Sequence, residues 1–290
     1  MKIFEKKALL KKWATILKSN SKTLGFVPTM GYLHEGHLSL ARAAMKECDR
    51  VIVSVFVNPT QFEPDEDYSK YPRDFERDKK MLEELRVDAI FHPSVEELYS
   101  QDTQKFQQIP HLPRHLSNIL CGHDRPHHFH GVAQAVNILF HIIQPDKAYF
   151  GQKDYQQTRA VDWLINTMKF SIGLRVMPTV REQNGLALSS RNLYLNSREK
   201  RLATLLYESL EYGKKLYKDD QKNPRLIEAK IKELIHQKLS TNQNTKMRLH
   251  YAEIRDAKDL SEITTIEKRS VILIAMTING TRLIDNVLIG

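Results

Sequence analysis

Two histidines, His34 and His37, enclose an acid and a glycine in the run PTMGYLHEGH (28–37), directly after a short apolar segment. Imidazoles this close together could bind a metal, relay a proton or hold a phosphate. Zinc sites on a helix favour histidines four positions apart beside a carboxylate base, and HEGH lacks that pattern. Gly36 instead lets the backbone approach a ligand at the start of a helix, where free amides and the dipole favour an anion. The residues favour a phosphate site, and the alternative is one histidine that caps the helix and one in solvent.

A second polar segment, NPTQFEPDEDYSKYPRD (58–74), follows the next apolar run. Asn58 and Gln61 are uncharged side chains that can both donate and accept hydrogen bonds beside the end of that run. Such amides suit the recognition of hydroxyl groups or of a carboxylate. We therefore expect this segment to form a second wall of the same cleft.

Two further loops carry cations. In YFGQKDYQQ (149–157), Lys153 can neutralise phosphate charge, and Asp154 can accept from a ribose, cap a helix or help to hold magnesium. In REQNGLALSSRN (181–192), two hydroxyls and Arg191 suit a loop that closes over phosphates, with a simple helix-cap loop as the alternative.

The histidine-rich run 111–130, which contains Cys121, is the strongest rival metal site. Its spacings match neither a zinc finger nor a ribbon of cysteine pairs, and one thiol supplies at most one sulfur ligand. A loop whose Arg125 faces a phosphate is the preferred interpretation, and we expect no protein-bound metal.

Alternating apolar runs and amphipathic segments position these loops. The run RVIVSVFV (50–57) is almost wholly apolar and rich in β-branched residues, as is typical of a strand covered on both faces. Alternation of strands and helices predicts a Rossmann-like, doubly wound parallel sheet that binds its ligand beyond the carboxyl ends of the strands. We expect strands over 22–28, 50–57, 87–93, 147–151 and 174–179, and helices over 37–48, 73–86, 130–143 and 154–169.

After about residue 178 the pattern changes to a small α+β domain. Asn279-Gly280 between the last two apolar runs predicts a hairpin with a primed turn. We expect a domain over 1–178 that binds ATP and substrate and a smaller lid domain over 179–290. Its expected elements are helices over 197–218 and 224–240 and strands over 246–255, 270–278 and 281–289.

Composition limits the class of protein. The net charge of +9 favours acidic partners, either nucleic acid or a phosphorylated small molecule, but the lysines are scattered and no aromatic RNA-reading motif occurs. With only two cysteines, no signal-peptide core and no apolar run of membrane-spanning length, we expect a cytoplasmic enzyme without membrane or nucleic-acid partners.

Five stretches together resemble one known family: PTMGYLHEGHLSL, VFVNPTQF, RPHHFHGV, YFGQKDYQQ and VREQNGLALSSRN. The chain is similar to pantoate–β-alanine ligases, of the HxGH nucleotidyltransferase superfamily. That resemblance implies ATP-dependent condensation of pantoate with β-alanine through a pantoyl adenylate, with Mg²⁺ accompanying ATP and a homodimer as the usual assembly. HEGH alone would leave open another nucleotidyltransferase, such as a cytidylyltransferase.

The resemblance also implies site residues. His34, His37, Lys153 and Arg191 would be catalytic, and pantoate and β-alanine would contact Gln61, Gln157, Asn58 and Arg125. The ATP site would comprise Met30, Gly31, Tyr32, Leu33, His34, Glu35, Gly36, His37, Gly151, Gln152, Lys153, Asp154, Val180, Leu188, Ser189, Ser190 and Arg191. Two positions depart from the family pattern: Gln152 stands where a glutamate is common, and His127 where a glycine is expected.

Overall fold

The computed structural model describes residues 1–242 and 245–290. This part of the chain forms two compact units, one of Met1–Gly151 with Ala160–Pro178 and one of Gln152–Arg159 with Thr179–Gly290. The expected division placed 152–159 with the N-terminal domain. In the structure these residues group with the C-terminal unit, and Tyr155 donates its hydroxyl to the carbonyl of Ala257 at 2.7 Å.

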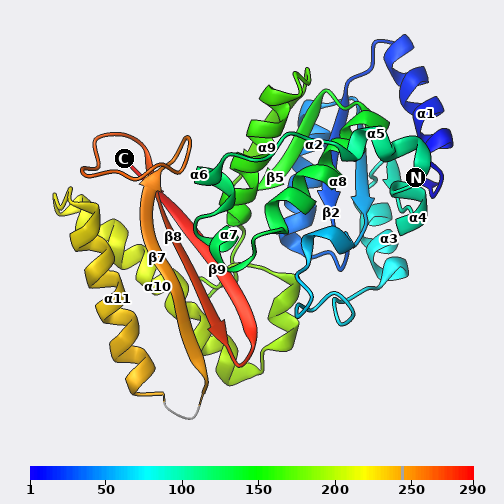
Figure 1. Ribbon diagram of the computed structural model, residues 1–290. Coiled ribbons are helices and arrows are strands. Elements are labelled where there is room, and N and C mark those ends of the chain that lie inside the picture. Colours follow the sequence, from blue (N-terminus) through cyan, green and yellow to red (C-terminus); the bar gives the residue numbers. More distant parts are fainter. Residues whose placement is uncertain (243–244) are drawn as a thin grey trace. The chain divides into compact units, whose positions relative to one another are not determined.

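The first unit contains a six-stranded parallel sheet in the order β1-β4-β3-β2-β5-β6 (Figure 1). From β2 the chain adds β3 and β4 on one side and later β5 and β6 on the other, so the strand order reverses between β2 and β5. Ligands of such sheets bind beyond the carboxyl ends of the strands at this reversal. The expected doubly wound sheet is thus confirmed. The strands are β1 (Lys2–Phe4), β2 (Leu24–Thr29), β3 (Arg50–Val55), β4 (Ala89–Phe91), β5 (Lys147–Gly151) and β6 (Gly173–Met177).

Helices cover both faces of this sheet. On one face, the apolar side chains of α2 (Glu35–Glu47) and α3 (Phe75–Glu84) pack against valines of β2 and β3 and against Tyr149 of β5. On the other face, Phe26 of β2 meets Phe140 of α8 (His128–Ile143) edge to face at 6.3 Å, and α1 (Lys7–Ser19) contacts α8. The helix α9 (Tyr155–Thr167) connects β5 to β6 through the 3-10 turn η3 (Gln152–Asp154).

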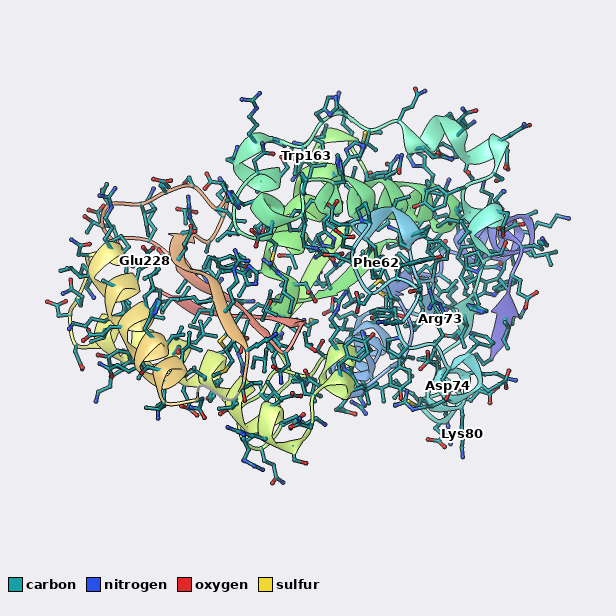
Figure 2. The ribbon with its side chains drawn as sticks, turned by 60° about the horizontal axis from the view of Figure 1, so that its bottom comes forward. Phe62, Arg73, Asp74, Lys80, Trp163 and Glu228 are labelled. Carbon is teal, nitrogen blue, oxygen red and sulfur yellow. The ribbon has the colours of Figure 1, made fainter. Side chains whose placement is uncertain are left out.

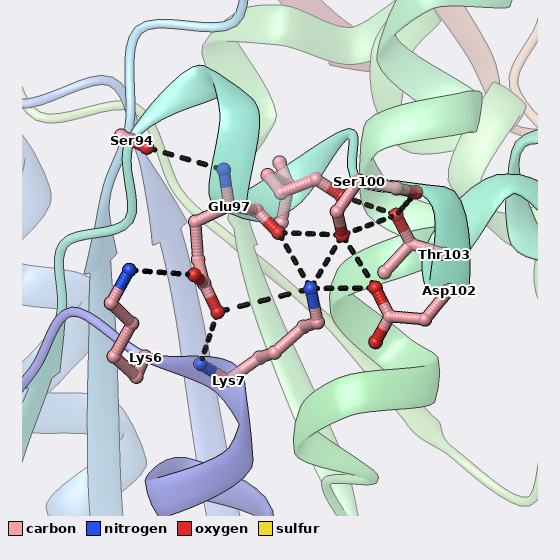
Figure 3. A network of polar contacts seen from close by, with 8 residues as sticks. Lys6, Lys7, Ser94, Glu97, Ser100, Asp102 and Thr103 are labelled. Carbon is pink, nitrogen blue, oxygen red and sulfur yellow. Dashed lines mark hydrogen bonds and ion pairs between the residues drawn. The ribbon is translucent and has the colours of Figure 1, made fainter.

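The segment between β4 and α8 forms short helices that periodicity did not predict. These are α4 (Val95–Leu98), η2 (Gln101–Thr103), α5 (Gln104–Gln107), α6 (Arg114–Ser117) and α7 (Cys121–Asp124). Its first part is tied to the start of α1 (Figure 3), where the ammonium of Lys7 contacts Asp102 at 2.8 Å and the carbonyl of Glu97 at 3.0 Å. The amide of Lys7 also donates to the Glu97 carboxylate at 3.0 Å. This network fixes the turn that carries Tyr99.

The second unit is a three-stranded antiparallel sheet covered by two helices. Its elements are α10 (Ser197–Lys218), α11 (Pro224–Ser240), β7 (Met247–Asp256), β8 (Ser270–Ile278) and β9 (Thr281–Ile289). Glu228 of α11, beside β7 in Figure 2, accepts from the amide of Ile254 at 2.7 Å, and burial raises the pKa of this carboxyl. Asn279 and Gly280 both have positive φ, 44° and 87°, which confirms the expected primed hairpin turn.

Among the helices of residues 1–242 and 245–290, none combines the length and apolar content of a membrane-spanning segment.

Candidate active site

The two histidines of HEGH lie side by side at the first turn of α2, shortly after the carboxyl end of β2, with their ring planes tilted by 31°. Their ring centroids are 4.0 Å apart. The Nδ1 atom of His34 accepts from the amide of Gly36 at 3.1 Å, and the Nδ1 atom of His37 accepts from the amide of His34 at 3.3 Å. The pair thus forms a capping box in which both histidines take part. Since each Nδ1 accepts a hydrogen bond, a neutral ring carries its proton on Nε2, where it can be donated to an anion.

This geometry changes one expectation. The sequence suggested free helix amides as anion ligands, but the amides of His34 and Gly36 are already bound to the two imidazole rings. These two amides therefore serve the cap of α2, while the helix dipole at this turn still favours an anion. The carboxylate of Glu35 is held by Arg42, which lies two turns further along α2, and this hydrogen bond lowers the pKa of Glu35.

Asp78 of α3, which sequence reasoning did not single out, fixes the loop in front of the histidines. One carboxylate oxygen accepts from the amide of Tyr32 at 2.6 Å and the other from the amide of Leu33 at 2.6 Å. Asp78 is 1% exposed, and its burial raises the pKa of the carboxyl while the two amides oppose that rise. Gly31 has φ +81°, and a Cβ there would lie 3.0 Å from the Asp78 carboxylate. The loop thus depends on this buried carboxylate.

The variant Asp78→Asn should raise the KM for ATP by about 10-fold, because one buried amide would face the NH₂ group and lose its acceptor, at a cost of about 1–3 kcal/mol. Steady-state kinetics with varied ATP checks this. Asp74→Asn is the matched control, since Asp74 is an exposed N-cap of the same helix (Figure 2) and asparagine caps equally well. Equal KM values in the two variants would contradict the role of Asp78.

The loop after β3 holds a fixed pair of amides. The side chain of Asn58, 2% exposed, donates to the Gln61 side-chain oxygen at 3.2 Å. Its own oxygen accepts from the hydroxyls of Tyr99 at 2.6 Å and Thr60 at 2.9 Å. Burial raises the pKa of Tyr99 to about 12, so this phenol keeps its proton at neutral pH. Asn58 therefore has one amide orientation, which fixes the side-chain oxygen of Gln61 as an acceptor and its NH₂ group as a donor.

That NH₂ group lies 2.9 Å from the sulfur of Met30, the first residue of the expected ATP set. The structure thus brings the loop after β2 and the loop after β3 together within one unit. The backbone carbonyl of Gln61 forms hydrogen bonds with the imidazole of His128 at 2.7 Å and with the guanidinium of Arg125 at 3.3 Å.

Arg125, expected to face a phosphate, forms a two-pronged ion pair with Glu66, with one Nη2–Oε2 distance of 2.7 Å. Its guanidinium therefore supports the loop that carries Gln61. His127, where a glycine was expected, has φ −96° and ψ −14°, an ordinary helical conformation that any residue adopts. Its amide donates to Glu63 at 3.0 Å, so this departure from the family pattern leaves the backbone unstrained.

The other residues that the sequence predicted for the ATP and substrate sites lie in the second unit, except Gly151 at the end of β5. Lys153 and Asp154 contact each other at 3.5 Å in η3, with side chains 20% and 46% exposed. The side-chain amide of Gln152 donates to Asn286 at 3.2 Å, so a glutamine is accommodated where the family often has glutamate. Gln157, on the first turn of α9, is half-buried.

Val180 and Leu188 lie opposite each other in a tight hairpin, since the carbonyl of Val180 accepts from the amide of Leu188 at 3.0 Å. The hairpin leads into the 3-10 turn η4 (Ser190–Tyr194), where the hydroxyl of Ser189 accepts from the amide of Arg191 at 3.3 Å. Ser190 is buried, and Arg191 is half-buried. The helix cap of the sequence interpretation is thus present, and the closure of this loop over phosphates stays a prediction.

Within the part of the chain that the structure describes, no group of three or more His, Cys, Asp or Glu side chains is arranged to hold a metal ion. In the histidine-rich run, the rings of His111 and His130 are 6.0 Å apart, and burial lowers the pKa of His130.

Known proteins similar to this chain agree with the motifs. A model of the family described as pantoate-beta-alanine ligase matches residues 2–288. The pantothenate synthetase of Thermotoga petrophila is 46% identical over 290 residues, the full length of both chains. The crystal structure of pantothenate synthetase from Thermus thermophilus superposes with a TM-score of 0.89 at 37% identity, over 99% of each chain. A pantoate-beta-alanine ligase from Francisella tularensis, solved in complex with beta-gamma ATP and beta-alanine, has a TM-score of 0.76 at 34% identity, over 99% of this chain and 97% of that one.

Proposed function

The chain belongs to the pantoate-beta-alanine ligase family and joins pantoate to β-alanine at the expense of ATP, and we propose that it does so through a pantoyl adenylate. The observation that carries this route is the pair of adjacent imidazoles at the switch point of the sheet, 4.0 Å apart and both with Nδ1 bound to backbone amides. Two Nε2–H donors at a helix start suit the phosphates of a nucleotide.

In the first step, a carboxylate oxygen of pantoate attacks the α-phosphorus of ATP, a new P–O bond forms, and pyrophosphate leaves. The carboxylate is already ionised near neutral pH, so the step needs alignment and charge dispersal and no general base. His34 and His37 donate to the phosphates, while Lys153 and Arg191 supply positive charge as phosphate ligands. The NH₂ group of Gln61, whose orientation Asn58 fixes, suits an oxygen of pantoate, and Gln157 is its proposed partner.

In the second step, the unprotonated amine of β-alanine attacks the acyl carbon and the C–N bond forms. The bond from that carbon to the bridging oxygen breaks, AMP leaves with this former carboxylate oxygen, and the nitrogen releases one proton to water. An amine attacks only in its unprotonated form, so rising pH favours this step. The mixed anhydride must be kept from water in the meantime, which is the task we assign to the hydroxyl-rich loop Leu188–Arg191 and the C-terminal unit that carries it.

We further propose that ATP enters as its magnesium complex. Hard divalent cations in such sites are held chiefly by substrate phosphates and water, with one or two carboxylates at most, and exposed Asp154 suits that role. We also assign the enzyme to the cytoplasm, because a chain with only two cysteines suits a reducing compartment. The proposed homodimer can be checked by sedimentation velocity.

Isotope exchange between pyrophosphate and ATP tests the adenylate route. We expect exchange that requires pantoate and magnesium and proceeds without β-alanine. Exchange in the absence of pantoate would instead indicate a nucleotidyltransferase that acts on another acceptor. If pantothenate is formed but no exchange between pyrophosphate and ATP occurs, the enzyme does not release pyrophosphate before β-alanine reacts. That result would contradict the proposed route.

A further inference from the structure

Two adjacent polar residues interrupt the apolar strand β9 of the second unit. Asp285 is 3% exposed and Asn286 is 2% exposed, although successive strand residues normally point to opposite faces. Burial of a polar side chain costs free energy unless the side chain is hydrogen-bonded, so both residues need hydrogen-bond partners inside the unit. Each of them contacts a different loop of the proposed nucleotide site.

Asn286 holds the loop of Lys153. Its side-chain NH₂ donates to the carbonyl of Gln152 at 2.8 Å and to the carbonyl of Lys153 at 2.9 Å. Its side-chain oxygen accepts from the side-chain amide of Gln152 at 3.2 Å. Both N–H groups and the oxygen of this buried side-chain amide therefore form hydrogen bonds with residues of η3. The position of the Lys153 backbone follows from them.

Asp285 holds the hairpin that leads to Arg191. Its carboxylate forms a two-pronged pair with Arg181, with distances of 2.5 Å and 2.9 Å. Arg181 also donates to the carbonyl of Gly185 at 3.1 Å and lies over the ring of Tyr207 at 4.6 Å. The ring of Tyr207 packs against the hairpin on the side opposite β9, so closely that a Cβ on Gly185 would lie 2.1 Å from it. The hairpin is thus clamped between β9 and α10.

We propose that Asp285 and Asn286 are positioning residues of the ligase reaction, which set the mutual placement of Lys153 and of the Ser189–Arg191 loop on one rigid strand. The inference rests on the proposed roles of Lys153 and Arg191 as phosphate ligands. Neither β9 residue touches the substrates in this scheme. They act because a displacement of about 1 Å in a charged ligand costs about 100-fold in rate.

Asn286→Asp tests this inference with a side chain of nearly the same shape. The carboxylate cannot donate, so it repels the two carbonyls and releases the Lys153 loop. We expect kcat/KM for ATP to fall by about 100-fold in the exchange assay. We also expect the KM for ATP to rise much more than the KM for pantoate. At lower pH the protonated carboxyl can donate one bond, so the defect should shrink.

Asn223→Asp is the matched control. Asn223 is the exposed N-cap of α11, where aspartate caps equally well, so this variant should behave as wild type. If the activity of Asn286→Asp falls only in proportion to the fraction of protein that is unfolded, and does not recover at lower pH, its role is structural and the inference is wrong. Normal kinetics would overturn it as well. An inactive wild-type enzyme would contradict the proposed function and not this inference.

Discussion

The variant His37→Gln is expected to lose about 100-fold or more of the pantoate-dependent exchange rate, as removal of one transition-state donor usually does. Glutamine at this third helical position can still accept from the amide of His34, as the capping box requires. The start of α2 should therefore stay intact, and the melting temperature should change by no more than about 4 °C. The imidazole Nε2–H is lost, and the glutamine NH₂, bonded to the same carbon as the capping oxygen, donates from a different position.

His37→Ala separates the two tasks of this residue. It removes the cap as well as the donor, so it should lose activity and about 1 kcal/mol of stability. His123→Gln serves as the control, because that histidine is 81% exposed and its ring meets the neighbouring Asp124 at 3.2 Å. Near-normal exchange by His37→Gln would mean that the ring of His37 caps the helix and does not contact phosphate.

The sequence predicted the parallel sheet well because its strands are dense in apolar, β-branched residues, as in 50–57. The sequence interpretation did not predict β1 and α1, because the charge of the lysine-rich N-terminus served only to exclude a signal peptide. A helical signal was present: Leu10, Ala14 and Leu17 are the buried residues of α1, and their spacing forms one apolar stripe. The short helices between β4 and α8 gave no such signal, because four residues are too few for periodicity.

The site was predictable where its residues are neighbours in sequence. HEGH carries its own capping geometry, and Asn58 lies three residues before Gln61, so local spacing located both loops. Asp78 lies far along the chain from the loop that it holds, and only the folded sheet brings them together. A signal existed here too. Asp78 lies on the apolar stripe of α3 with Phe75 and Leu82, where a carboxylate needs a buried partner.

The same reasoning applies to β9. The run LIDNVLI (283–289) is apolar except at Asp285 and Asn286, and a polar pair inside a core strand indicates specific partners. Sequence alone could not identify these partners, because Arg181 and Gln152 lie more than a hundred residues away. Interrupted apolar patterns therefore indicate where supporting residues lie, and the fold is needed to show what they support.

Gly131→Ala should impair the enzyme severely, although alanine in a helix is normally more favourable than glycine by about 1 kcal/mol. Gly131 lies in the first turn of α8, where a Cβ would be 2.0 Å from the carbonyl oxygen of Thr60 and 2.9 Å from the amide nitrogen of Gln61. Both are backbone atoms and cannot rotate away. The 3-10 turn η1 (Pro59–Gln61) must shift, together with the amide of Asn58 that donates to the Gly131 carbonyl at 3.2 Å.

Because that turn carries the proposed pantoate contacts, the KM for pantoate should rise by about 100-fold. The KM for ATP should rise less, since the capping box of α2 forms its hydrogen bonds within its own turn. Gly213→Ala is the matched control: this glycine is also helical, but its Cβ would meet only the flexible ends of Ile231 and Ile272 closely, at 2.6 and 2.9 Å. Those side chains can turn aside, so this variant should keep both KM values. A Gly131→Ala enzyme with an unchanged KM for pantoate would show that the turn after β3 does not bind it.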